Sequence, residues 1–138
     1  MEKHFTNTAT IKFSYQRLIL YGIVTELLLI ALQFVYIRIY SGPNNFVFND
    51  NYMRYEGFYI FQLIGFFLYV TATYWLSNRI HKDLFIHIAV FVIAGCLLEF
   101  AFYFIIQAKW QGVFLYSVLS KLIAGVFGIV ISLYSSTK

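Results

Sequence analysis

Charged residues are scarce in this sequence: Asp, Glu, Lys and Arg make up 12% of its 138 residues, against about 25% in an average soluble domain. Proline occurs only once, and 61% of the residues are hydrophobic. So little polar sequence excludes a water-soluble globule. It also excludes disordered, collagen-like and linker proteins, which are rich in polar residues, proline or glycine. The composition therefore predicts a membrane protein.

Cysteine also occurs once, as Cys96, so the chain cannot form an intramolecular disulfide. The sequence has no Cys/His cluster with metal-ligand spacing, no glycine-rich phosphate loop and no nucleophile–base motif. We therefore expect no metal, no cofactor and no enzymatic activity. The formal net charge is +4, but the basic residues form short runs between apolar blocks, so we expect no nucleic-acid partner.

Four apolar blocks are each long enough to cross about 30 Å of hydrocarbon as a helix. They cover residues 18–37, 58–76, 84–106 and 113–134. Backbone polar groups in lipid must be satisfied within the segment, and the blocks are too long for the strands of a barrel, so we predict helices. The predicted fold class is an all-α membrane protein in which residues 1–138 form one domain of four transmembrane helices.

The basic residues between the blocks are distributed unevenly, with six on the side of both termini and three on the other. This asymmetry favours cytoplasmic termini. The six are Lys3, Lys12, Arg17, Arg79, Lys82 and Lys138, and the three are Arg38, Arg54 and Lys109.

The sequence contains an internal repeat. Residues 63–79 align without a gap on residues 122–138, at an offset of 59, and the first and third blocks align at an offset of 66. The repeat predicts two helical hairpins of the same orientation, a two-plus-two architecture.

Each block also contributes one polar residue at a similar depth. Gln33, Gln62, Glu99 and Lys121 lie 13 to 15 residues from the block ends on the side of the termini, which is about 20–22 Å along a helix. Glu26 lies two turns from Gln33 on the same face. Charged residues in the membrane interior are costly unless paired, so we expect Glu99 and Lys121 to be partners. We interpret all five as candidate substrate-binding residues; the alternative is that they only hold the helices together.

Three segments resemble the GtrA-like family of small four-span membrane proteins: QRLILYGIVTELL (16–28), YWLSNR (74–79) and LSKLIAGVFGIVISLY (119–134). The resemblance implies movement of a polyprenyl-phosphate-linked sugar across the bacterial cytoplasmic membrane for cell-envelope glycosylation, beside a membrane glycosyltransferase. For such a cargo, we interpret Arg17 and Arg79 as phosphate-binding or headgroup-binding residues.

Two other functions stay open at this point. Glu26, about one third of the way along the first block, fits a proton-coupled exporter of the small multidrug-resistance type, although the positive Lys121 conflicts with a site for cationic drugs. The small size and aromatic surfaces fit a non-transporting subunit of a larger complex. Because four spans hardly enclose a polar pathway, we expect a homo-oligomer or a membrane partner.

Overall fold

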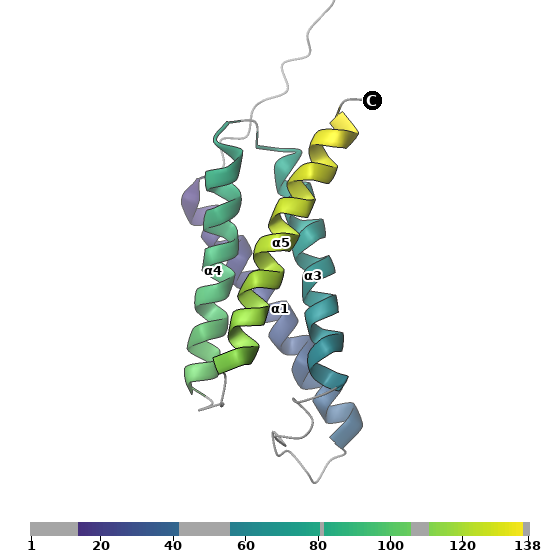
Figure 1. Cartoon of the computed structure of the whole chain (residues 1–138). Coiled ribbons are helices and arrows are strands. Elements are labelled where there is room, and N and C mark those ends of the chain that lie inside the picture. The colour runs from purple at the N-terminus through teal and green to yellow at the C-terminus, as the bar shows by residue number, and fades with distance from the viewer. Residues whose placement is uncertain (1–13, 42–55, 81, 106–110, 137–138) are drawn as a thin grey trace, which may run out of the picture.

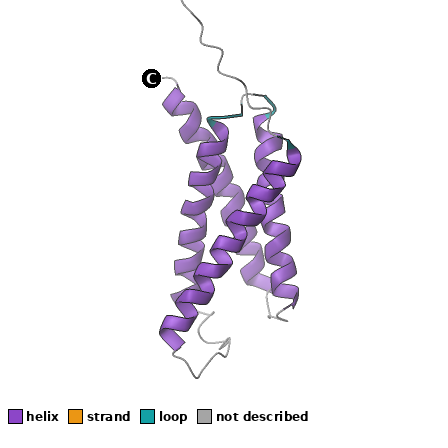
Figure 2. Ribbon diagram, turned by 180° about the vertical axis from the view of Figure 1, so that it is seen from behind, coloured by secondary structure: helices purple, strands orange, loops and turns teal. Residues whose placement is uncertain are grey.

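A computed structural model describes residues 14–41, 56–80, 82–105 and 111–136, which form four helices in one bundle (Figures 1 and 2). They are α1 (Tyr15–Ser41), α3 (Glu56–Ser77), α4 (Leu84–Ile105) and α5 (Gln111–Ser136). The described ranges contain no strand, and all four helices are long and apolar enough to cross a membrane. The predicted all-α class is confirmed, and the architecture indicates a multi-pass membrane protein.

The helices extend beyond most of the predicted block ends. Helix α1 begins three residues before the predicted start, because the Ser14 side chain caps it: Ser14 Oγ accepts a hydrogen bond from the Arg17 backbone N–H at 3.4 Å. At its other end, α1 continues to Ser41 instead of residue 37. Hydropathy marks only the part of a helix that lies in hydrocarbon, whereas the helix itself can continue into the polar headgroup region. The predicted end of the third block, residue 106, lies outside the described residues.

The four helices pack closely as two parallel pairs, α1 with α4 and α3 with α5. Tyr15 stacks on His87 near the beginnings of α1 and α4, and Phe34 meets Phe102 farther along the same two helices. Each helix thus lies beside its counterpart in the internal repeat, which agrees with two hairpins of the same orientation. We call these units the α1/α4 pair and the α3/α5 pair, and the boundary between them the seam.

Glycines permit the close approach within each pair. A Cβ atom added to Gly22 of α1 would collide with the Phe91 carbonyl oxygen of α4. A Cβ atom on Gly128 of α5 would collide with Thr73 Oγ1 of α3. The Thr73 hydroxyl donates to the Tyr69 carbonyl of its own helix at 2.7 Å and lies 3.4 Å from the Ala124 carbonyl oxygen of α5. Small residues are the usual means of bringing two helix backbones together in a membrane.

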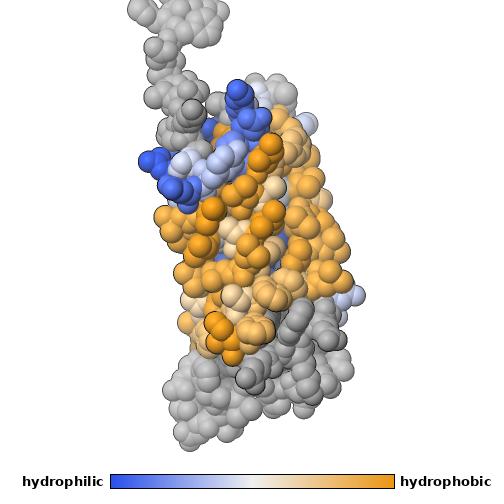
Figure 3. Space-filling view, turned by 90° about the vertical axis from the view of Figure 1, so that its left-hand side faces the viewer, coloured by the Kyte–Doolittle hydropathy of each residue, from blue (hydrophilic) through white to orange (hydrophobic). Residues whose placement is uncertain are grey.

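One end of the bundle carries the start of α1, the end of α5 and the connection from α3 to α4 (Figure 1); we call it the terminal end, and the opposite one the distal end. Near the terminal end, Leu18, Leu76, Ile80 and Ile88 are buried in an apolar core. The side of the bundle in Figure 3 is a hydrophobic surface with hydrophilic residues gathered near the terminal end. This pattern is the one expected of a surface in contact with lipid.

Candidate functional site

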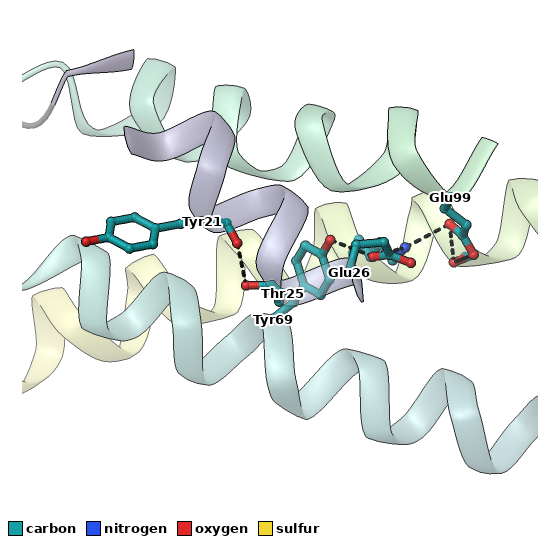
Figure 4. A network of polar contacts seen from close by, with 7 residues as sticks. Tyr21, Thr25, Glu26, Tyr69 and Glu99 are labelled. Carbon is teal, nitrogen blue, oxygen red and sulfur yellow. Dashed lines mark hydrogen bonds and ion pairs between the residues drawn. The ribbon is translucent and has the colours of Figure 1, made fainter. Parts of the chain in front are cut away.

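Three ionisable side chains form a buried cluster at the centre of the bundle (Figure 4). The Lys121 ammonium donates to Glu26 Oε2 and to Glu99 Oε2, each at 2.7 Å. No more than 4% of any of the three residues is exposed. The predicted pairing of Glu99 with Lys121 is confirmed. The structure adds a second ion pair from the same ammonium to Glu26.

Two hydroxyl groups complete the surroundings of the carboxylates. Tyr69 donates to Glu26 Oε2 at 2.8 Å. Ser117 Oγ lies 2.7 Å from Glu99 Oε1 and 2.9 Å from Oε2. The Lys121 ammonium also lies 5.3 Å from the centroid of the Tyr69 ring, within the range of a cation–π interaction. The cluster therefore replaces part of the hydration that these charges lose on burial.

Local sequence explains how the donors reach the acids. Ser117 precedes Lys121 by four residues, so both project from the same face of α5. Gly95 of α4 faces the Tyr69 hydroxyl, and a Cβ atom at Gly95 would collide with that oxygen. The absence of a side chain at Gly95 thus leaves room for the Tyr69–Glu26 hydrogen bond.

Gly95→Ala tests this fit. The Tyr69 side chain is fully buried and cannot move away freely, so we expect the extra methyl group to displace its hydroxyl from Glu26 and to lower the free energy of unfolding by about 1–3 kcal/mol. Unfolding of the purified protein in a mild detergent measures the change. A combined Gly95→Ala, Tyr69→Phe variant should be closer to wild type than Gly95→Ala alone; equal stability of Gly95→Ala and wild type would contradict the proposed fit.

The charges are divided between the two helix pairs. Both carboxylates belong to the α1/α4 pair, with Glu26 on α1 and Glu99 on α4. The donors Tyr69, Ser117 and Lys121 all belong to the α3/α5 pair. Every hydrogen bond of the cluster described above therefore crosses the seam. The hydrogen bonds of the cluster thus link the two pairs to each other, and the contact of the Lys121 ammonium with the Tyr69 ring lies within the α3/α5 pair.

A small cavity of about 10 Å³ adjoins the cluster on its distal side, which is room for about one water molecule. The structure brings together around it the four residues that the sequence places at one depth, one from each helix: Gln33, Gln62, Glu99 and Lys121. The Gln33 and Gln62 side chains are half-buried, and within the described ranges neither amide forms a hydrogen bond with the protein. These two amides are available to a ligand or to water.

Arg17 and Arg79 do not join the cluster. Both are exposed at the terminal end, where the Arg79 guanidinium lies 4.4 Å from the centroid of the Trp75 ring. Arg17 precedes Glu26 by nine residues, which corresponds to about 14 Å along α1. The predicted phosphate-binding residues and the predicted substrate-binding residues therefore occupy different levels of the bundle.

No protein-family model, curated protein or solved structure matches this chain. The interpretation of the site therefore depends on its own residues and geometry. Among the residues that the structure describes, no group of three or more His, Cys, Asp or Glu side chains is placed to hold a metal ion.

Sequence reasoning missed the hydroxyl partners of the two acids. Tyr69 shares a helix face with Gln62, Gly65 and Thr73 at spacings of three and four residues, and that face is polar enough to indicate an inward orientation. The sequence therefore held a signal that Tyr69 faces the interior, but it held none that Tyr69 contacts Glu26, because helix periodicity does not identify the neighbouring helix.

Proposed function

We propose that this protein is a membrane transport protein whose site is the Glu26–Lys121–Glu99 cluster and the adjoining cavity. The observation that carries the proposal is that all four helices place a polar side chain at one site inside an apolar bundle. Ionisable groups at such depth are costly and typically mark a pathway for a substrate or a proton.

The size of the cavity favours a lipid-linked cargo over a free solute. About 10 Å³ cannot enclose a sugar or a drug, so a cargo must pass between separating helices. A polyprenyl-phosphate-linked sugar suits such a passage, because its hydrocarbon chain can stay in the bilayer while the polar group moves along the seam. The Gln33 and Gln62 amides can donate to and accept from sugar hydroxyls.

The phosphate of such a cargo has two possible sets of partners. Lys121 is already bonded to two carboxylates, so it must exchange one of them to bind a phosphate. Arg17 and Arg79 are exposed at the terminal end and suit a phosphate at the membrane surface. We propose that these arginines receive the phosphate group at that surface and that the glutamines contact the sugar during passage. A membrane glycosyltransferase that makes the lipid-linked sugar is the partner that this function requires.

The charge of the cluster supports a second candidate, a proton-coupled exporter of cationic compounds. The positive Lys121 argued against such a site on sequence alone, but in the structure two carboxylates flank it. The local balance is therefore acidic, which suits a cationic cargo.

Reconstituted vesicles distinguish the two candidates. A polyprenyl-phosphate sugar with a radiolabelled sugar is placed in the vesicle membrane, and its crossing is followed with periodate, which oxidises only exposed sugar. We expect the protein to accelerate crossing. The double variant Gln33→Leu, Gln62→Leu should reduce the initial rate at least about tenfold, because two lost hydrogen bonds are each worth about 1 kcal/mol.

Leu32→Met is the matched control, since Leu32 is exposed on α1 beside Gln33; it should leave the rate unchanged. Crossing no faster than in protein-free vesicles would contradict a lipid-linked cargo. Uptake of a cationic dye driven by a pH gradient would then favour the exporter, and absence of both activities would contradict transport.

A further inference from the structure

The formal charges of the central cluster do not balance. Glu26 and Glu99 supply two carboxylates, and each has an oxygen 2.7 Å from the single ammonium of Lys121. The cluster therefore carries a formal charge of −1 when its three groups are ionised. Among the side chains that the structure describes, the other Lys and Arg residues are Arg17, Arg79 and Lys82, near the terminal end. A net charge is expensive to bury in a medium of low dielectric constant, so the cluster favours the binding of one further positive charge.

Neutral side chains without a partner lie beside the acids. Gln33, Gln62 and Ser120 line the small cavity together with Glu99, and within the described ranges these three neutral side chains form no hydrogen bond with the protein. Each of the four residues comes from a different helix. The cavity is thus lined by carboxylate, amide and hydroxyl oxygen atoms, which are the ligands that hard cations prefer.

Charge and size together select the kind of cation. One monovalent cation brings the formal charge of the cluster to zero. A divalent ion would exceed that charge, and among the described residues no group of three or more His, Cys, Asp or Glu side chains could hold it. The cavity of about 10 Å³ has room for about one water molecule, so a cation must enter without its hydration shell, which the oxygen atoms of the cavity then replace. Na⁺ suits so small a space better than the larger K⁺.

A proton on one of the acids would also neutralise the cluster. It would leave the oxygens of Gln33 and Gln62 without a partner, whereas a cation in the cavity accounts for both the excess charge and these oxygens. Lys121 lines the cavity as well. Its repulsion of a second cation is opposed by the two carboxylates that flank it.

We propose that the cavity is a binding site for one Na⁺, with oxygen ligands from Gln33, Gln62, Glu99 and Ser120. Because these ligands come from all four helices, the ion bridges the seam, and its release weakens the connection between the two helix pairs. The site itself does not require the proposed function, which enters only where a Na⁺ gradient drives the movement of cargo.

Binding of radioactive Na⁺ to the purified chain in detergent tests the proposal without any cargo. Scintillation proximity counting measures the bound ion, and choline chloride replaces NaCl so that the ionic strength stays constant. We expect saturable binding of one Na⁺ per chain, which unlabelled NaCl displaces more effectively than KCl does. The temperature of thermal unfolding should rise with NaCl but not with choline chloride, because a ligand that binds only the folded state stabilises it.

Two variants separate the ligands from the charge. Gln33→Leu, Gln62→Leu removes two ligands and keeps the charge, so the dissociation constant of Na⁺ should rise at least about tenfold. Glu26→Gln keeps every proposed ligand but neutralises the cluster without a cation, so it should also weaken Na⁺ binding at least about tenfold; it provides a test even when Glu99→Gln does not fold. Leu32→Met, beside Gln33 on α1, is the matched control and should bind Na⁺ as the wild type does.

Three outcomes would overturn the proposal. The wild type shows no saturable Na⁺ binding, as it would if a proton balanced the charge; or NaCl and choline chloride stabilise it equally, so that only ionic strength matters; or Gln33→Leu, Gln62→Leu binds Na⁺ with unchanged affinity, which would place the ion elsewhere. Because the measurement uses no lipid-linked sugar, failure of Na⁺ binding and failure of the translocation assay are separate results.

Discussion

Lys121→Met will lower the free energy of unfolding by about 3–5 kcal/mol, because it removes the ammonium that both buried acids share. Both acids bond to that ammonium at 2.7 Å, and no other lysine or arginine is bonded to either of them among the described residues. Methionine keeps much of the volume of lysine, so packing changes contribute little. Denaturant unfolding in mixed micelles measures the loss.

The adjacent position supplies the control. Leu122 is on the same helix and is 47% exposed, so Leu122→Met introduces the same residue at a lipid-facing site. It should change stability by less than about 0.5 kcal/mol. Equal stabilities of the two variants would show that the cluster does not depend on the Lys121 charge.

The four helices could be predicted from the sequence because each block is long and apolar. Length and hydropathy are properties of the block itself and do not depend on which helices it packs against. The pairing of Glu99 with Lys121 could be predicted from opposite charge and equal depth. The bond from Lys121 to Glu26 could not, because Glu26 lies seven residues nearer the terminal end than Gln33, at a different predicted level. A lysine side chain is flexible and long enough to bridge more than one helical turn of 5.4 Å, so an ion pair can also form between residues at different depths.

The sequence also could not predict that the acids and their hydrogen-bond donors lie on different helix pairs. A polar face can show which side of a helix is turned inward, but it does not show that α1 packs against α4 and α3 against α5. The glycines Gly22 and Gly128 determine that pairing by close contact, and a glycine in a sequence does not identify the residue it will face. The structure shows that both acids lie on one pair and all their donors on the other.

The division at the seam makes it possible to separate a packing role of the cluster from a transport role. The variant for this purpose replaces the whole network with apolar residues of similar volume: Glu26→Leu, Tyr69→Phe, Glu99→Leu, Ser117→Ala and Lys121→Met. It leaves neither an unpaired charge nor a hydroxyl without its acceptor. We therefore expect its stability to equal that of the wild type within about 1 kcal/mol or to exceed it, in contrast to Lys121→Met alone.

The same variant should be inactive. With no charge left at the seam, only the Gln33 and Gln62 amides remain to favour a polar group over lipid, so we expect the rate of lipid-linked sugar crossing in vesicles to fall to near that of protein-free membranes. The comparison is decisive because activity is expected to be lost while stability is expected to be kept or to rise. A variant that folds and still transports at the wild-type rate would show that the Glu26–Lys121–Glu99 cluster serves only to join the two helix pairs.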